Sequence, residues 1–379
     1  MNLLMYSGDS DVARGREGPF HNTLAGLSPR WERIDVITPG HADACPTTLF
    51  GNVHIHPSTR HRFIQRWFVV NRVKELAAQR RYSLAVSHDH GIFSNGFAAM
   101  TLRSQLGIPY VSEIHHVPGV PRAGSLNERI QKWIARFYVA RARGRATAFR
   151  AVNNVQMPAL FRDWGVAADK ILVLPSAYLD FEVFHPDESA EPAWDVLFCG
   201  RLDPNKGLDL LAAAAAIVAR ARPEVRFLVV GDGPGAAGLR TDLDRRGISD
   251  RFEICRWVET PDDLADCYRR SRLLLCTSYS EGGPRVVLEA MACATPVVST
   301  PVGVVTELIE DRVTGRLVDW QSADIATAIL EVLDDPAATA RMARLAHQAV
   351  LPLDRQVTLD DYADAYVRLA EEQERRRTA

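Results

Sequence analysis

Two glutamates, Glu281 and Glu289, stand on either side of a glycine-containing turn in the second half of the chain. The turn reads Gly282-Gly283-Pro284, and an apolar run over residues 272–277 precedes it. This order predicts a strand, a turn and a helix that begins with proline, which helices accept at their first position. The first N–H groups of a helix favour an anion such as phosphate, whereas carboxylates accept hydrogen bonds from hydroxyls. Together these preferences suggest a sugar nucleotide, with a capped helix and two solvated glutamates as the alternative.

A similar pattern opens the second half of the chain. Residues 198–207 read F-C-G-R-L-D-P-N-K-G, so an apolar strand is followed by a loop that carries Arg201 and Lys206. Two cations at the carboxyl end of a strand can clamp a diphosphate, arginine with two hydrogen bonds and lysine as a point charge. A polar loop with surface charges is the alternative. A further turn over residues 229–235 contains Gly231, which we interpret as mainly structural, with contact to a nucleotide as the alternative.

Glycines and histidines follow the strands expected in the first half. Gly15 and Gly18 come after the first of these strands and would let a loop approach a ligand; a flexible surface loop is the alternative. His88 and His90 follow another strand, but a metal site needs further ligands in tetrahedral arrangement, and the spacing supplies none. His115, after a third strand, is the better candidate for a hydrogen bond to a sugar or leaving group.

One segment of the first half is strongly basic. Residues 121–150 carry eight Lys and Arg but a single acid, Glu128. The apolar residues within it recur at helical spacing, which predicts an amphipathic helix. These residues are Ile130, Trp133, Ile134, Phe137 and Tyr138. We expect this face to pack on its own sheet, with peripheral membrane contact through Asn127–Arg143 as the alternative. Nucleic acid is not indicated, because no zinc pattern or aromatic RNA-binding motif accompanies the charge.

Composition is that of an ordinary globular protein with room for two domains. The chain has 379 residues, of which 47% are hydrophobic and 24% charged. No apolar run reaches the length of about eighteen residues that a membrane helix needs. The six cysteines form no C-x-x-C pair, so neither zinc nor a disulfide framework is indicated and a cytoplasmic location is expected. Residues 1–188 hold 22 Lys and Arg against 16 Asp and Glu, and the remainder 23 against 31, which suggests two bodies with different partners.

Strand-like and helix-like patterns alternate along both halves, which predicts an α/β fold with parallel sheets covered by helices. A segment with three prolines, residues 174–193, interrupts the alternation. Two doubly wound domains would leave a cleft at the carboxyl ends of their strands, where such sheets bind ligands. The expected organisation is an N-terminal Rossmann-like domain over 1–175, a linker over 176–193, a second Rossmann-like domain over 194–355, and a C-terminal helix over 356–379 for which packing on the N-terminal domain is one possibility.

These motifs, in this order, resemble the retaining glycosyltransferases of family 4, which have the GT-B fold of two Rossmann-like domains facing a cleft. The resemblance spans nearly the whole chain and is strongest over residues 195–310. Its most specific parts are the E-x7-E pattern from Glu281 to Glu289 and the G-R-L-x-x-x-K-G pattern over Gly200–Gly207. Departures are the separated glycines of the first loop, the sequence Pro175-Ser176-Ala177 where the family often has P-N-G, and a Gly-Gly-Pro turn in place of G-F-G.

The resemblance assigns roles to individual residues. It implies that Glu281 contacts hydroxyls of the transferred sugar, that Glu289 holds the ribose, and that His115 lies near the reacting sugar. The catalytic residues it implies are Glu281, His115, Arg201 and Lys206. The donor-binding residues are Arg201, Lys206, Gly282, Gly283, Arg285, Val286, Glu289 and Gly18, to which Gly231 is added from its own turn.

The resemblance also implies a reaction. We expect transfer of a hexose, with retention, from a UDP- or GDP-linked donor to an acceptor hydroxyl, without a cofactor or a metal. Lys206, Arg201 and the helix N-terminus would stabilise the charge that gathers on the diphosphate. A GT-B sugar-nucleotide epimerase and a non-catalytic nucleotide-sugar-binding protein are the alternatives; a nicotinamide oxidoreductase is disfavoured because no G-x-G-x-x-G follows the first strand. The acceptor stays open between a small metabolite, a lipid-linked sugar and a polysaccharide.

Overall fold

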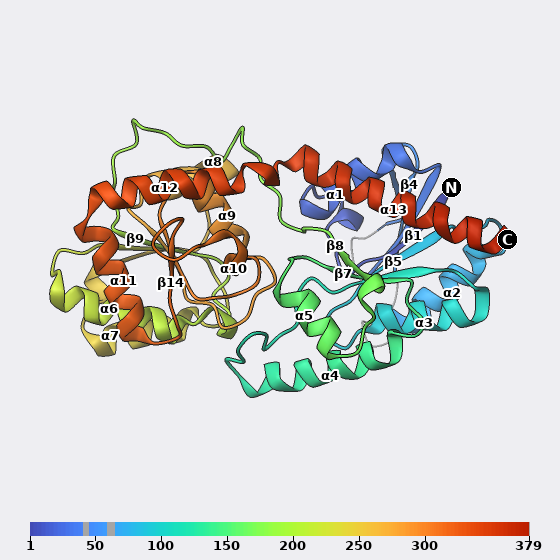
Figure 1. The fold of residues 1–379 in the computed structure, drawn as a ribbon, viewed down its shortest axis with the longest axis horizontal. Helices are drawn as coiled ribbons and strands as arrows, with labels where there is room; N and C mark the ends of the chain where they lie inside the picture. The colour runs from blue at the N-terminus through green and yellow to red at the C-terminus, as the bar shows by residue number, and fades with distance from the viewer. Residues whose placement is uncertain (41–44, 59–64, 379) are drawn as a thin grey trace. The chain divides into compact units, whose positions relative to one another are not determined.

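The chain divides into two compact units, each built around its own sheet (Figure 1). A computed structural model describes residues 1–40, 45–58 and 65–378. Unit 1 comprises Met1–Val117, Gln131–Ser176 and Gln356–Ala379, and unit 2 comprises Pro118–Ile130 and Ala177–Arg355.

The sheet of unit 1 has eight strands within the described residues, in the order β3-β4-β2-β1-β5-β6-β7-β8. Their bounds are β1 Asn2–Tyr6, β2 Arg33–Thr38, β3 Thr47–Leu49, β4 Val53–Pro57, β5 Leu84–His88, β6 Tyr110–Glu113, β7 Ala148–Ala151 and β8 Ile171–Val173. Strand β3 pairs antiparallel with β4, whereas the other neighbouring pairs are parallel. The alternating pattern did not predict this edge hairpin. Its short connection, which turns at Phe50 and Gly51 with positive φ, leaves no room for the crossover that a parallel pair requires.

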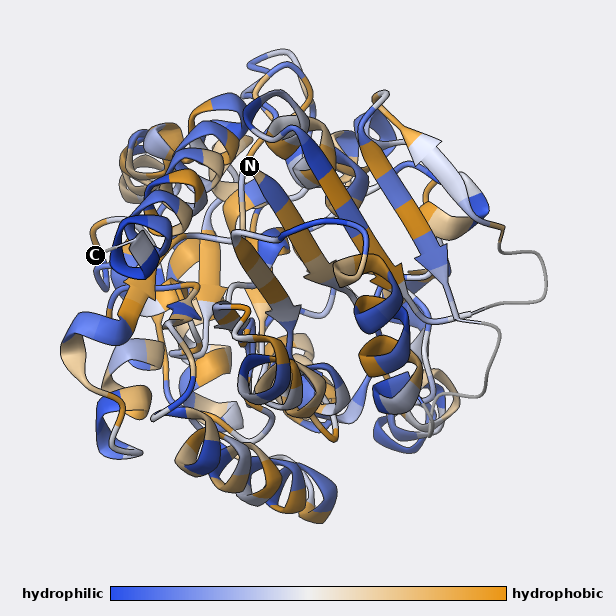
Figure 2. Cartoon of the chain, turned by 90° about the vertical axis from the view of Figure 1, so that its right-hand side faces the viewer, coloured by the Kyte–Doolittle hydropathy of each residue, from blue (hydrophilic) through white to orange (hydrophobic). Residues whose placement is uncertain are grey.

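Helices cover both faces of the unit 1 sheet, and hydrophobic residues run along its central strands (Figure 2). The helices are α1 Pro19–Leu27, α2 Gln65–Ala77, α3 Ser94–Leu106, α4 Leu126–Ala142, α5 Gln156–Asp163 and α13 Arg355–Thr378. Helix α4 belongs to unit 1 from Gln131 onward, and its start up to Ile130 belongs to unit 2. Alternate residues of β1 point to opposite faces, so Leu3 and Met5 pack with α1 and α13, while Leu4 and Tyr6 are buried on the other face.

The C-terminal helix α13 is part of the core of unit 1. Tyr362, Ala363, Tyr366 and Ala370 recur at helical spacing and are buried against the sheet. Because small alanines alternate with large tyrosines along this face, the helix approaches the strands closely while the tyrosine rings reach into the sheet's carboxyl edge.

Unit 2 has a six-stranded parallel sheet in the part of the chain that the structure describes, in the order β11-β10-β9-β12-β13-β14. Its strands are β9 Val196–Cys199, β10 Phe227–Val230, β11 Phe252–Cys255, β12 Leu274–Cys276, β13 Val297–Ser299 and β14 Arg316–Leu317. Its helices are α6 Leu208–Ala221, α7 Ala236–Arg246, α8 Pro261–Arg269, α9 Arg285–Ala292, α10 Val305–Leu308, α11 Ser322–Asp334 and α12 Pro336–Val350.

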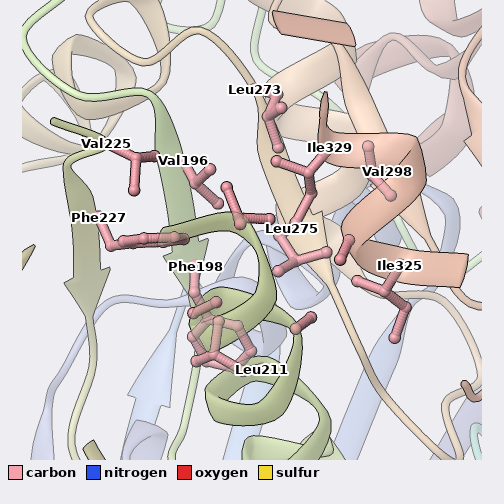
Figure 3. Packing of buried hydrophobic residues seen from close by; sticks show 14 of the residues in the cluster. Val196, Phe198, Leu211, Val225, Phe227, Leu273, Leu275, Val298, Ile325 and Ile329 are labelled. Atoms are coloured by element: carbon pink, nitrogen blue, oxygen red, sulfur yellow. The ribbon is translucent and has the colours of Figure 1, made fainter. Parts of the chain in front are cut away.

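The core of unit 2 has a large apolar cluster on one face of the sheet, contributed by β9, β10 and β12 together with α6 and α11 (Figure 3). Phe198, Phe227 and Leu275 are buried in it beside Leu211 of α6 and Ile329 of α11. Helix α6 is rich in alanine, which has the highest helix propensity and lets the helix lie close to the strands. A second cluster, which includes α9, covers the other face.

Two segments belong to unit 2 although the sequence predicts otherwise. The predicted linker over 176–193 is part of unit 2 from Ala177 onward, because Leu179 and Phe184 are buried in its core. Residues Pro118–Ile130, which the sequence assigns to the N-terminal domain, also belong to unit 2, where a β-bridge joins Pro121 to Ser280.

Candidate functional site

The strand order of unit 2 creates a topological switch point between β9 and β12. Strand β9 comes first in the unit, with β10 on one side and β12 on the other, so the connections leave this pair in opposite directions. Open parallel sheets bind ligands outside the carboxyl ends of their strands at such a point. The loop after β9 carries Arg201 and Lys206, and the loop after β12 carries Glu281. The two motifs found in the sequence therefore lie at the same edge of one sheet.

Lys206 and Glu281 form an ion pair at this edge. The Nζ of Lys206 donates to Oε1 of Glu281, and only 19% and 15% of the two side chains are exposed. The Oγ of Ser278 donates to the same carboxylate oxygen over 3.1 Å. Burial disfavours the Lys206 ammonium, but the neighbouring Glu281 outweighs it and raises the pKa of Lys206 above its ordinary value. The site thus holds one fixed positive and one fixed negative charge.

Gly207 permits the close approach of the two loops. Its φ of 65° is favourable only for glycine, and a Cβ at this position would lie 2.1 Å from the carbonyl oxygen of Thr277. The Oγ1 of Thr277 donates in turn to the carbonyl oxygen of Lys206 over 2.8 Å. These contacts fix the backbone from which the Lys206 side chain extends.

Arg201 has a different environment from Lys206. Its side chain is 77% exposed, and its guanidinium pairs with Asp203, with Nε 3.2 Å from a carboxylate oxygen. The sequence treats the two cations as equivalent, whereas the structure brings Lys206 alone of the two into contact with Glu281.

Glu289 lies in the buried part of α9. Its Oε2 accepts a hydrogen bond of 2.9 Å from the hydroxyl of Tyr268, and its Oε1 lies 3.5 Å from Nε of Arg285. Burial raises the pKa of Glu289, and the arginine and the tyrosine only partly offset the effect. Tyr268 is the orienting partner that sequence reasoning missed; its position on α8, 21 residues earlier, gives no local signal.

Helix α9 begins at Arg285, one residue later than the sequence predicts, with Pro284 as its N-cap. The carbonyl oxygen of Gly282 accepts a hydrogen bond from the Val304 amide, which ties the turn to the loop after β13. The amides of Arg285 and Val286 stand in the first turn of the helix, where N–H groups have no partner within the helix and favour an anion.

Two further glycines that the sequence predicts to bind the donor, Gly283 and Gly231, differ in their surroundings. A Cβ on Gly283 would meet only a valine methyl at 3.6 Å, so this side of the turn has room. A Cβ on Gly231 would lie 2.0 Å from the carbonyl oxygen of Gly200. Gly231 is therefore needed for the packing of two loops, and its contact with a nucleotide stays a prediction.

The segment Pro118–Ile130 supports the Glu281 loop from outside. The hydroxyl of Ser280, next to Glu281, donates to Glu128 over 2.5 Å. Arg122 lies over the rings of Tyr279 and Trp320, at 5.8 and 5.5 Å from their centroids. The sequence did not predict these contacts. The signal that could have indicated them is Glu128, the single acid in the basic segment over residues 121–150.

Unit 1 has its own switch point, between β1 and β5. Ser7 follows β1 and its Oγ lies 3.2 Å from Nδ1 of His88, the last residue of β5. Gly18 is the N-cap of α1, and a Cβ there would meet nothing within 4 Å, so the start of this helix is open. Burial lowers the pKa of His88 to about 4, which makes it a neutral side chain at neutral pH.

His115 follows β6 at the same edge of the unit 1 sheet. Its side chain is 48% exposed, and its Nε2 lies 2.9 Å from Oε2 of Glu113, the last residue of the strand. The sequence singled out His115 but not Glu113, because nothing in a Glu-Ile-His run indicates that the glutamate is buried.

Neither a cluster that could hold a metal nor a membrane-spanning helix occurs in the described part of the chain. Residues 1–40, 45–58 and 65–378 contain no cluster of three or more His, Cys, Asp and Glu side chains arranged to hold a metal ion. Over these same stretches, none of the helices combines the length and the apolar character that crossing a membrane requires.

Two Rossmann-like sheets, each with polar loops after its strands at a topological switch point, define a protein of the doubly wound α/β class, in which this edge of the sheet is where ligands bind. Family models refine this class. Residues 180–349 match the model described as glycosyl transferases group 1, and residues 20–177 match that of a glycosyl transferase 4-like domain.

Curated relatives agree with the family models. A D-inositol 3-phosphate glycosyltransferase of Kribbella flavida is 30% identical over 312 residues, which is 76% of this chain and 73% of the relative. Another of the same name, from Segniliparus rotundus, is 32% identical over 288 residues, 69% of this chain and 62% of the relative. The chain thus spans less than two thirds of the length of the Segniliparus protein. It belongs to the glycosyltransferase family that these relatives represent.

Solved structures share the fold. The sucrose-phosphate synthase of Thermosynechococcus elongatus matches with a TM-score of 0.81 at 21% identity, over 97% of this chain and 98% of the other. HepE of Anabaena, in complex with UDP-glucose, matches with a TM-score of 0.74 at 21% identity, over 97% and 99%. The chain therefore has the GT-B fold of two Rossmann-like domains.

Proposed function

We propose that this protein is a retaining family-4 glycosyltransferase that moves a hexose from a nucleotide diphosphate sugar to an acceptor hydroxyl. The observation that carries the proposal is the Lys206–Glu281 pair at the switch point of unit 2. A lysine suits a diphosphate as a point charge, and a carboxylate suits sugar hydroxyls as an acceptor. The buried Glu289, oriented by Tyr268, would accept from the ribose hydroxyls.

Charge stabilisation at the leaving group is the proposed source of catalysis. As the glycosidic bond breaks, negative charge grows on the diphosphate, and groups that interact more strongly with this charge than with the ground state lower the barrier. Lys206 is held in place for this role. Arg201 is exposed and would reach the diphosphate by exchanging its Asp203 partner, and the first amides of α9 would add a third contribution. We propose that these groups act without a divalent metal.

The donor and acceptor are proposed by class. HepE of Anabaena is known in complex with UDP-glucose, and this supports a UDP-linked hexose, with a GDP-linked one as the alternative. Relatives are D-inositol 3-phosphate glycosyltransferases, which supports a phosphorylated polyol as acceptor beside the lipid-linked sugars and polysaccharides left open by the sequence. His115 would contact the reacting sugar. We also propose a cytoplasmic location, on the ground that the cysteines show no paired spacing.

The test combines binding and turnover. Nucleoside diphosphates and their hexose conjugates would be screened by thermal shift, since a ligand at 100 times its Kd stabilises the fold by about 2.7 kcal/mol. Proton NMR of the product with the best donor, with and without EDTA, then reports anomeric configuration and metal dependence. Transfer with the donor's configuration kept supports the proposal. An isomerised nucleotide sugar, or binding with no turnover on any acceptor class, would instead support the epimerase or the binding protein.

The exposed face of helix α4 supports a second proposal, which is contact with an anionic lipid surface. The sequence predicts that Ile130, Trp133, Ile134, Phe137 and Tyr138 form the buried face. The structure confirms burial of Tyr138, which lies inward together with Ala135, Val139 and Ala142. It leaves Leu126, Ile130, Trp133 and Phe137 exposed. The small residues allow a closer approach to the neighbouring elements, so they take the inner face and the large residues turn outward.

Basic side chains flank this exposed apolar stripe. Arg129, Arg136 and Arg141 are exposed on the same helix, and the guanidinium of Arg141 lies 3.7 Å from the ring centroid of Phe137. An apolar stripe bordered by cations is the pattern of helices that lie in the interface of an anionic membrane. We therefore propose that α4 docks there and brings the enzyme to a membrane-associated acceptor.

Flotation with vesicles tests this contact. Trp133→Ser should reduce binding to vesicles rich in phosphatidylglycerol at least severalfold, and wild-type protein should not bind pure phosphatidylcholine. Trp67→Ser is the matched control, because Trp67 is equally exposed but lies on α2. Equal binding of the two variants, or equal binding of wild type to both vesicle types, would contradict the proposal.

A further inference from the structure

His115 is held by a carboxylate that is itself saturated with donors. The ring Nε2 of His115 lies 2.9 Å from Oε2 of Glu113, and the guanidinium of Arg150 donates to the same oxygen over 3.0 Å. The other oxygen, Oε1, accepts from the hydroxyls of Tyr362, over 2.7 Å, and Tyr366. Glu113 thus links the exposed histidine to β7 and to the C-terminal helix α13.

The chemistry of these partners fixes the charge on Glu113. Burial opposes its ionisation, but Arg150 and the nearby histidines outweigh burial and hold the pKa of Glu113 well below its usual range. Arg150 is itself anchored, since its Nε and NH2 donate to the carbonyl oxygens of Leu174 and Pro175 over 3.0 and 2.6 Å. Glu113 is therefore an anion without a proton to donate.

The tyrosines complete the set as donors. Burial, together with the Glu113 carboxylate, raises the pKa of both Tyr362 and Tyr366 well above the ordinary value, so their hydroxyls stay protonated. A carboxylate that can only accept requires that its histidine partner carry a proton on the facing nitrogen. His115 is therefore protonated on Nε2, and in its neutral form Nδ1 is an acceptor.

We propose that Glu113 is a positioning residue that holds His115 as the Nε2–H tautomer, with Nδ1 free of a proton to accept a hydrogen bond from a hydroxyl of the sugar substrate. The inference rests on the proposed function for the identity of the ligand, but the tautomer itself does not. It assigns a role to α13: its two tyrosines bind the far oxygen of Glu113 and prevent the carboxylate from rotating away from the histidine.

His88 is the other ring close to Glu113. Its Nε2 lies 3.3 Å from Oε2 of Glu113, and its ring centroid is 5.7 Å from that of His115. Because burial lowers the pKa of His88 to about 4, it is neutral at neutral pH, and Arg150 supplies the positive charge beside Glu113. The His88 ring packs edge-on against Phe20, with the two ring centroids 5.1 Å apart.

The direct test is a side-chain ¹H–¹⁵N spectrum at mildly alkaline pH, with the His115 signals assigned from a His115→Gln sample. Wild type should show the pattern of the Nε2–H tautomer. Glu113→Gln should mix the two tautomers, because an amide can both donate and accept. A wild-type His115 protonated on Nδ1, or a Glu113→Gln spectrum identical to wild type, would overturn the proposal whether or not the protein transfers sugar.

A pair of His115 variants tests the ligand side and does not disturb the buried carboxylate. The amide of asparagine reaches the position of Nδ1, and that of glutamine reaches the position of Nε2. If Nδ1 meets the substrate, His115→Asn should keep kcat within about tenfold of wild type, and His115→Gln should lose on the order of a hundredfold. The reverse order, or equal loss, would contradict the assignment of Nδ1. Both His115 variants should bind UDP as the wild type does, because UDP is proposed to bind unit 2. If the wild-type protein does not bind UDP, the proposed function fails, and the assignment of Nδ1 is not what has been refuted.

Tyrosine variants test the role of α13. Tyr362→Phe together with Tyr366→Phe should lower kcat about tenfold, which corresponds to a barrier higher by about 1.4 kcal/mol. Tyr82→Phe is the matched control, because its hydroxyl donates over 2.7 Å to another buried carboxylate, Asp35. It should cost similar stability with normal kcat. Equal kcat losses in the double tyrosine variant and in Tyr82→Phe, or no loss in either, would contradict a positioning role for α13.

Discussion

Replacing Glu281 by glutamine should strengthen the binding of UDP and weaken sugar transfer. In the structure Glu281 neutralises Lys206, and both side chains are largely buried. Glutamine has almost the same size but no charge, so the variant exposes an unneutralised ammonium to the diphosphate. The same change removes the carboxylate that is proposed to accept hydrogen bonds from the sugar. Binding of the nucleotide and turnover of the nucleotide sugar should therefore change in opposite directions.

The magnitude follows from the geometry of the pair. Two unit charges about 4 Å apart interact by about 4 kcal/mol at an effective dielectric constant of 20, a value suited to a partly buried site. Lys206 is proposed to contact the diphosphate directly, so we expect Glu281 to act on it from a greater distance, and salt and rearrangement reduce the effect further. After these reductions, we expect Glu281→Gln to strengthen UDP binding by about 1.4 kcal/mol, which is a tenfold lower Kd. The loss of a hydroxyl acceptor used in the transition state should lower kcat on the order of a hundredfold.

Isothermal titration with UDP and initial rates with the UDP-sugar measure the two effects. Lys206→Ala should weaken UDP binding at least tenfold, and Glu253→Gln is a control for the change in net charge, since Glu253 pairs with Trp194 on the edge strand. Arg201→Ala should weaken binding less than Lys206→Ala, because its guanidinium is solvated and already paired. Weaker UDP binding by Glu281→Gln would refute the view that the carboxylate opposes the diphosphate.

Three further outcomes are expected. Gly207→Ala should destabilise the fold by more than 2 kcal/mol by denaturant unfolding, a rough figure for a strained positive φ and a forced contact, whereas Gly238→Ala, in an open position of α7, should be neutral or stabilising. Tyr268→Phe should leave Glu289 poorly oriented and raise the Kd for UDP about tenfold with little change for inorganic diphosphate, which has no ribose. Burial raises the pKa of Asp89 to about 7, above its unfolded value, so the folded state retains a proton that the unfolded state loses. The free energy of unfolding should therefore fall as pH rises from about 4 to 7. The Asp89→Asn variant should lack this slope.

The alternation of strands and helices could be predicted because each element carries its own period. Residues 94–106 and 208–221 repeat apolar side chains at helical spacing, and the structure has helices with those bounds. The β3–β4 hairpin could not be found in this way, because β3 has only three residues and its side chains are only partly buried. Helix α12 was not predicted for a different reason: two of its four buried residues, Ala343 and Ala346, are alanines, which carry a weak hydrophobic signal.

The loops of the donor site were predictable in position but not in pairing. Sequence order shows that Lys206 and Glu281 each follow a strand, and the doubly wound fold brings such loops to one edge. Which of Lys206 and Arg201 meets the glutamate depends on side-chain direction within a turn of a few residues. Gly207, with its left-handed φ, lets this turn approach Thr277 closely. Glu113 and its tyrosines are 249 and 253 residues apart, so no local pattern could connect them.

Helix α4 shows why a correct helix can be given the wrong face. Apolar side chains cover two stripes of this segment, one of large residues that includes Trp133 and Phe137, and one that includes Ala135 and Ala142. Hydrophobicity alone favours burial of the first stripe, since the aromatic rings would remove more apolar area from water. Packing reverses the choice, because Tyr138 places its hydroxyl on the buried Asp89 over 2.9 Å, and its ring packs against the space left by a glycine of α3. A residue that satisfies a buried carboxylate fixes the rotation of the whole helix, and two stacked aromatic side chains are left on the surface as its consequence.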